Sequence, residues 1–183
     1  KFFHEKKINF LFVGQLIERK GLGYIFSAFN KLSKKEKEKL NLNIVGEGNL
    51  RGKLKQFLKI NTYTKYHGFL FGKNLSKIYK KSDVLLFPSK FDGWGVVPME
   101  AMSNSLSLII SKTSGISEIL KNKNNGFLIE PNETALYKAL KKCLNNKSMI
   151  KKQGIINRRL VLNSVCNSKN ATKFLLDKFF NIK

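Results

Sequence analysis

The sequence has few of the residues that build metal sites, disulfide frameworks and membrane spans. It contains two histidines and two cysteines, and the cysteines lack the spacing of metal ligands. We therefore expect no metal site, and we expect Cys143 and Cys166 to be buried free thiols in a reducing cytoplasm. No apolar run approaches the roughly 18 residues that a membrane-spanning helix needs.

Acidic residues are also scarce, with 12 against 35 basic residues and a formal net charge of +23. Such a surplus would suit nucleic acid or an anionic membrane surface. Only four of the basic residues are arginine, which nucleic-acid readers prefer for forked contacts. Nucleic acid is therefore not an expected partner. The lysines form either a solvated surface or a peripheral contact with the inner face of the cell membrane.

Apolar runs and amphipathic stretches alternate along the chain with short links. This pattern predicts an α/β fold, a Rossmann-like doubly wound parallel sheet of about six strands with helices on both faces. The expected strands span 8–13, 42–45, 66–69, 83–87, 106–111 and 126–129. The expected helices span 22–32, 50–60, 75–81, a segment from near Pro98, 116–120, and several segments after Glu133.

The chain shows no internal repeat and no linker, so residues 1–183 are predicted to form a single domain. It begins at Lys1 with no signal peptide and no initiator methionine, and we expect it to be part of a longer protein.

The connection at 91–102 is the most informative stretch, because it joins a buried strand to a helix and carries Asp92 and Glu100. Ligands bind to such connections at the carboxyl ends of parallel strands. Two glycines between the acids let main-chain N–H groups approach a ligand, and the helix start offers further donors to a phosphate. The carboxylates accept hydrogen bonds from hydroxyl groups. The connection therefore predicts a site for a sugar-phosphate.

Three earlier strand ends carry further candidates. Lys20, near the start of a helix, would place an ammonium near a diphosphate, unless it is a surface lysine. The turn at 46–50 is not a dinucleotide fingerprint, because Arg51 stands where the third glycine is needed. It is either a tight turn or a ligand contact. His67 lacks partners for a triad or a metal site, which leaves a structural role or a contact with a base or phosphate.

In this order the segments resemble the motifs of family 4 glycosyltransferases, also called glycosyltransferase group 1, which have the GT-B fold. Asp92 and Glu100 match the paired-acid motif, with Asp where the first Glu is usual. The segment 14–21 matches Gly-Arg-x4-Lys-Gly, but Gln15 replaces the arginine and Arg19 is the candidate substitute. Further matches, over about residues 8–145, are Val45–Asn49, Ser82–Asp83, Ser114–Glu118 and Asn125–Leu128.

The resemblance implies the carboxyl-terminal, donor-binding half of a retaining hexosyltransferase in cell-surface polysaccharide or glycolipid synthesis. Its co-substrate would be a nucleotide-diphosphate sugar, without cofactor or metal. Lys20 and Asp92 would be catalytic, acting on the diphosphate and on the transferred sugar, and Glu100 would hold the ribose. The implied donor-binding residues are Gly14, Gln15, Lys20, Gly46, Gly48, His67, Asp92, Gly93, Trp94, Gly95, Val96, Val97 and Glu100.

The resemblance also implies a partner: the protein's own amino-terminal acceptor domain, which this chain lacks. Residues 170–183 would be the helix that crosses to it, and the isolated chain would be inactive. Two alternatives remain. One is a GT-B relative of another class, such as a nucleotide-sugar epimerase. The other is a basic, non-enzymatic module that binds anionic surfaces or nucleic acid.

Overall fold

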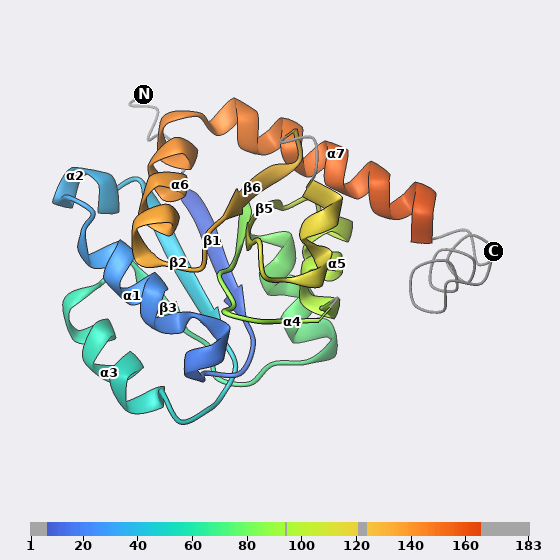
Figure 1. Cartoon of the computed structure of the whole chain (residues 1–183). Coiled ribbons are helices and arrows are strands. Elements are labelled where there is room, and N and C mark those ends of the chain that lie inside the picture. The colour runs from blue at the N-terminus through green and yellow to red at the C-terminus, as the bar shows by residue number, and fades with distance from the viewer. Residues whose placement is uncertain (1–6, 94, 121–123, 166–183) are drawn as a thin grey trace.

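The structure is a computed structural model that describes residues 7–93, 95–120 and 124–165 (Figure 1). Six strands form one sheet in the order β3-β2-β1-β4-β5-β6, and every neighbouring pair is parallel. The predicted α/β class and strand number are confirmed. The strands are β1 Ile8–Val13, β2 Leu40–Val45, β3 Thr64–Tyr66, β4 Val84–Phe87, β5 Ser107–Ser111 and β6 Gly126–Ile129.

Helices cover both faces of the sheet, with α1, α3 and α6 on one side and α4 and α5 on the other (Figure 1). Alternate residues of β1 show why its sequence is apolar throughout: Phe10 and Phe12 join one core cluster, while Leu11 and Val13 join the other. The helices are α1 Leu22–Asn30, α2 Lys34–Lys37, α3 Arg51–Ile60, α4 Gly72–Lys80, α5 Val96–Ser103, α6 Glu133–Asn145 and α7 Lys147–Val165, with 3-10 helices η1 Glu18–Lys20 and η2 Gly115–Leu120.

Several boundaries differ from the prediction, and β3 differs most. The strand was expected at 66–69 but lies at Thr64–Tyr66, paired with Leu42–Ile44 of β2. Gly68 has a φ of 67°, a left-handed conformation that a strand cannot contain, and Phe69 beyond it is 70% exposed. The apolar pattern therefore belongs to the loop after the strand. In addition, β2 starts earlier than expected and α4 begins at Gly72.

The lysine-rich stretch after α1 contains a short helix that the apolar pattern does not predict. Ser33 and Glu36 form a capping box at the start of α2, in which each side chain accepts a hydrogen bond from the other's main-chain N–H. The cap, rather than an apolar face, therefore accounts for helix α2.

Cys143 is a buried free thiol, as predicted, and burial raises its pKa to about 12. Cys166 lies outside the described residues.

Helix α7 packs directly on the main chain that links α5 to β5. A Cβ atom at Gly154 would lie 2.0 Å from the carbonyl oxygen of Ser105, so only glycine fits there. One turn later the buried Asn157 amide donates hydrogen bonds to the carbonyl oxygens of Leu106 and Asn125, both at 2.8 Å. This close packing makes a helix-interior glycine necessary despite its low helix propensity.

We expect Gly154→Ala to lower the free energy of unfolding by about 2 kcal/mol or more, because backbone would have to move to admit the methyl group. Gly52→Ala is the matched control, since Gly52 is also helical but has no atom within 4 Å of the added Cβ. It should raise stability by about 0.5–1 kcal/mol. Urea unfolding followed by circular dichroism measures both, and a shift in the same direction for both would contradict this packing.

Candidate active site

The loops that follow β1, β2 and β3 are joined to one another by main-chain hydrogen bonds at the carboxyl edge of the sheet. The N–H of Gly14 donates to Val45 at 3.1 Å, and the N–H of Gly46 donates to Gly68 at 2.8 Å. These bonds fix the floor of the region where parallel sheets bind ligands.

Gly46 and Gly48 are required by this joining of loops. A Cβ atom at Gly46 would lie 1.9 Å from the carbonyl oxygen of Gly14, and one at Gly48 would lie 2.5 Å from that of Leu16. Of the two interpretations left open by the sequence, the tight turn has a clear physical basis. A direct contact of these glycines with a donor stays a prediction.

Lys20 and Asp92 meet although they are 72 residues apart in the chain. The ammonium of Lys20 lies 2.5 Å from Asp92 Oδ2, and the side chains are only 17% and 13% exposed. Lys20 comes from the end of η1 after β1, and Asp92 from the loop after β4, so the neighbouring positions of β1 and β4 create the contact. Two residues expected to serve different parts of a donor are therefore paired with each other.

Hydroxyl groups support the Asp92 loop, and those of Ser89 and Ser111 are buried. Ser89 donates to Asp92 Oδ2 at 3.2 Å, and the Ser89 carbonyl accepts from Ser111 at 2.6 Å and from Thr113 at 3.0 Å. The N–H of Gly115 donates to the carbonyl oxygen of Asp92 at 3.1 Å. Sequence reasoning missed Ser89, for which the only signal was a hydroxyl residue two positions after the end of a buried strand.

Arg19 braces the same loop from outside. Its guanidinium donates to the Phe91 carbonyl oxygen at 2.9 Å, while its own carbonyl accepts from the N–H of Lys90 at 2.8 Å. Gln15, at the position where the family has arginine, is exposed. Arg19 therefore joins η1 to the Asp92 loop through main-chain contacts.

Glu100 lies on α5, whose first turn contains Val96 and Val97 and has no side-chain cap. The helix start is preceded by Gly95, with a φ of 72°. Uncapped N–H groups at this end can donate to an anion. The buried Tyr79 hydroxyl donates to Glu100 Oε2 at 2.8 Å, and burial together with the Glu100 charge raises the pKa of Tyr79.

A cavity of about 310 Å³ opens between the ends of β1 and β2. Its lining residues are Val13, Gly14, Gln15, Val45, Gly46, Glu47, Phe69 and Leu70. The lining combines apolar side chains with main chain at two glycines, which suits a flat heterocycle.

His67 is not part of this lining. Its Nε2 lies 2.8 Å from Asn43 Oδ1. The pKa of His67 is lowered mainly by burial and also by the charge of Lys65. Trp94 lies outside the described residues.

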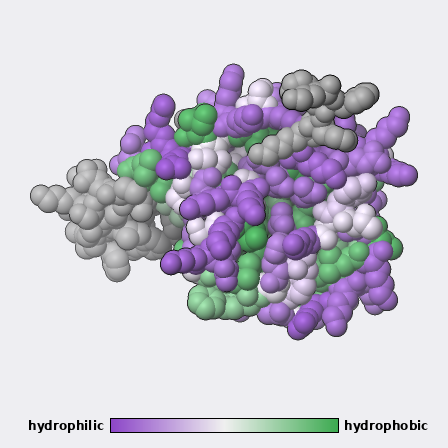
Figure 2. All heavy atoms as spheres, turned by 180° about the vertical axis from the view of Figure 1, so that it is seen from behind, coloured by the Kyte–Doolittle hydropathy of each residue, from purple (hydrophilic) through white to green (hydrophobic). Residues whose placement is uncertain are grey.

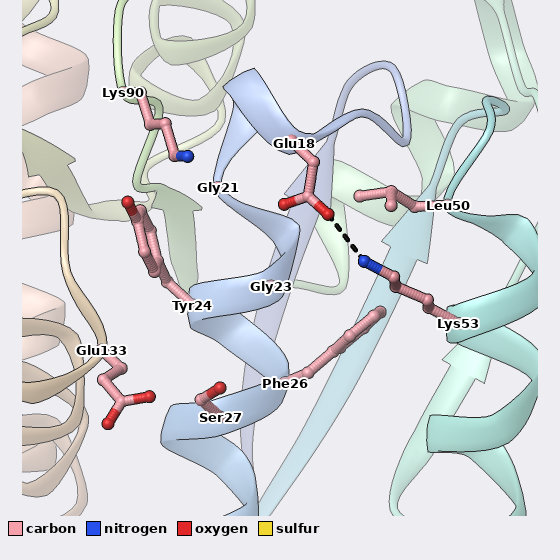
Figure 3. A pocket seen from close by; sticks show the side chains of 10 residues that line it. All are labelled: Glu18, Gly21, Gly23, Tyr24, Phe26, Ser27, Leu50, Lys53, Lys90 and Glu133. Atoms are coloured by element: carbon pink, nitrogen blue, oxygen red, sulfur yellow. Dashed lines mark hydrogen bonds and ion pairs between the residues drawn. The ribbon is translucent and has the colours of Figure 1, made fainter.

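A second cavity, of about 280 Å³, lies beside α1 and contains none of the predicted donor-binding residues (Figure 3). Glu18 and Lys53 face each other across it as an ion pair at 2.9 Å, and Lys90 and Glu133 add one charge of each sign. These charges balance, so this cavity favours neither an anion nor a cation. The described residues also hold no group of three or more potential metal ligands.

The sequence profile of the family Glycosyl transferases group 1 matches residues 1–159. The chain belongs to this family. One relative is an uncharacterised glycosyltransferase of Methanocaldococcus jannaschii, 33% identical over 143 residues, which are 69% of this chain and 36% of that protein.

Two solved structures share the fold of this group 1 chain. The C-terminal domain of LpcC, a glycosyl transferase group 1 family protein of Francisella tularensis, has a TM-score of 0.75 at 21% identity and covers 86% of both chains. Anabaena HepE, in complex with UDP, has a TM-score of 0.79 at 16% identity over 92% of this chain and 48% of its own. The fold is thus the Rossmann-like carboxyl-terminal half of a GT-B enzyme. This chain spans less than half of HepE and of the Methanocaldococcus jannaschii relative.

The Lys20–Asp92 pair leads to a prediction of opposite signs for two variants of this group 1 domain. Asp92→Asn leaves the Lys20 ammonium without its carboxylate, so pyrophosphate should bind roughly fivefold more tightly, corresponding to about 1 kcal/mol. Lys20→Met should bind pyrophosphate more weakly than the wild type. Calorimetric titration measures both affinities. General damage to the site would weaken pyrophosphate binding in both variants. Weaker binding by Asp92→Asn would contradict the idea that Asp92 and pyrophosphate compete for Lys20.

Proposed function

We propose that this chain is the donor-binding half of a retaining hexosyltransferase that uses a nucleotide-diphosphate sugar. The observation that carries the proposal is the meeting of Lys20 with Asp92, next to the uncapped start of α5. A cation, two carboxylates and free N–H donors on neighbouring loops suit a ligand with both phosphates and hydroxyls. The UDP complex of HepE, which shares the fold, supports a donor of this class.

The donor would lie across the carboxyl edge from β2 to α5. The apolar cavity takes the base, and Glu100 accepts hydrogen bonds from the ribose hydroxyls. Lys20 and the N–H groups of 95–97 bind the diphosphate. Asp92 then accepts from a hydroxyl of the transferred sugar, with the main chain of Gly93 beside it.

In the transfer step the bond between the anomeric carbon and the diphosphate oxygen breaks as the acceptor oxygen bonds to that carbon on the same face. Negative charge grows on the leaving diphosphate, and Lys20 with the loop N–H groups stabilises it. The leaving phosphate oxygen takes the acceptor's proton, so neither a protein nucleophile nor a metal ion is needed.

The rest of the enzyme would be an amino-terminal acceptor domain, reached by the helix expected at 170–183, which lies outside the described residues.

Contact with an anionic membrane stays a prediction from the net charge of +23. Figure 2 shows hydrophilic side chains over most of the rear face, with apolar residues exposed in smaller areas. No described helix is long and apolar enough to cross a bilayer. Salt-sensitive sedimentation with anionic vesicles tests this contact.

Glu100→Ala tests the ribose assignment. Losing the charged acceptor of two hydroxyls should weaken the binding of a ribonucleoside diphosphate about 10- to 100-fold, or ~1.5–3 kcal/mol, while the domain stays folded. Glu38→Ala makes the same charge change at an exposed surface position and should leave the affinity unaltered. Calorimetric titration gives the affinities, and equal affinities for the two variants would refute the assignment.

A product assay tests the division of labour between the two halves. The acceptor must come within about 3–3.5 Å of the anomeric carbon, which needs groups from both domains. We expect no transfer by this chain alone and transfer once it is joined to its natural amino-terminal half. Turnover by the isolated chain would place the acceptor site within residues 1–183. Interconversion of sugars without any acceptor would instead indicate an epimerase.

A further inference from the structure

Tyr79 lies in the last turn of α4 and is 2% exposed, within the core cluster that also contains Leu11, Val13 and Phe87. A buried phenol must find a partner for its hydroxyl, and here that partner is the carboxylate of Glu100 at 2.8 Å. The ring is fixed by packing, so the position of its hydroxyl is fixed as well. The carboxylate of Glu100 on α5 is therefore tied to a rigid point in the core.

We propose that Tyr79 is a positioning residue that orients Glu100 for a ribose and makes the site distinguish ribonucleotides from 2′-deoxyribonucleotides. The proposal rests on the function proposed above. Tyr79 holds Oε2, and within the part of the chain that the structure describes no hydrogen bond reaches Oε1. A carboxylate oxygen can accept two hydrogen bonds, so Oε1 is the atom left to accept from the ribose diol.

The same arrangement occurs at the other acid of the site. Lys20 and Ser89 both bond to Asp92 Oδ2, and no described residue hydrogen-bonds to Oδ1. Each acid thus has one oxygen held by the protein and one turned to other partners. Holding one oxygen fixes the direction of the other, which reduces the conformational freedom that the acid loses on binding. The raised pKa of Tyr79 keeps its hydroxyl protonated, so that it remains a donor.

The test compares nucleotide pairs that differ only in the 2′-hydroxyl. Calorimetric titration of the chain with UDP, GDP and ADP identifies the diphosphate that binds best, which is then compared with its 2′-deoxy form. Tyr79→Phe should bind the ribonucleotide about 3- to 10-fold more weakly and the deoxynucleotide almost as well as before, so the ratio of affinities falls. Thermal unfolding checks that the variant is folded, since the ring is retained.

Two further variants make the result specific. Tyr66→Phe is the matched control, because it removes a phenol hydroxyl that donates to the main chain of Gly46 at 3.1 Å, and it should keep the ratio. Glu100→Gln should lower the ratio, and adding Tyr79→Phe to it should change little more, because both act through one contact.

The outcomes separate the two proposals. If Tyr79→Phe weakens both nucleotides equally, or neither, Tyr79 has only a structural role and the inference is overturned. If Glu100→Gln retains the full ratio, or if the wild-type chain binds none of the three diphosphates, the proposed function fails first. A lower ratio in both single variants with no added effect in the double variant supports both.

Discussion

β1 is hydrogen-bonded to β2 on one side and to β4 on the other, and the chain leaves these strands toward opposite edges of the sheet. At such a reversal the two outgoing loops separate and open a crevice. The loop after β1 brings Lys20 to this crevice and the loop after β4 brings Asp92. The site therefore depends on one topological fact, the pairing of β1 with β4. The hydrogen bonds described above hold the loops that follow these strands in place.

The loops around the site are held in place mainly by hydrogen bonds of main-chain and hydroxyl groups, and less by charged side chains. Gly46 and Gly48 let neighbouring loops approach closely, and the buried Ser111 donates a hydrogen bond to the carbonyl oxygen of Ser89 in the loop that carries Asp92. Backbone and hydroxyl groups keep their hydrogen bonds at any salt concentration, whereas surface charges are screened. In a protein with a net charge of +23, the bracing of the candidate site therefore does not depend on the lysine-rich surface.

The sequence predicted the elements well because burial on both faces gives long apolar runs. The assignment of Lys20, Asp92 and Glu100 to a donor site follows the spacing of a family motif and stays a prediction. Sequence reasoning missed contacts that join distant segments. The Lys20–Asp92 pair spans 72 residues, and no local pattern encodes it. Tyr79 was missed for a different reason, since a tyrosine on the apolar side of a helix is indistinguishable in sequence from an ordinary core residue. β3 was misplaced because a left-handed glycine followed by an exposed phenylalanine resembles a strand.

The two departures from the family motif lie on the loops that follow β1 and β4, two strands that pair with each other. Gln15 removes a positive charge from the β1 loop, and Asp92 shortens the acid that meets Lys20 from the β4 loop. Lys20 is thus the cation that both the Asp92 carboxylate and an incoming diphosphate would share. Under the proposed function, donor binding exchanges one ion pair for another, and the gain is smaller than for an unpaired lysine. Under the same proposal, the return of Lys20 to Asp92 after transfer would favour release of the diphosphate, so the pair that limits donor affinity would also assist turnover.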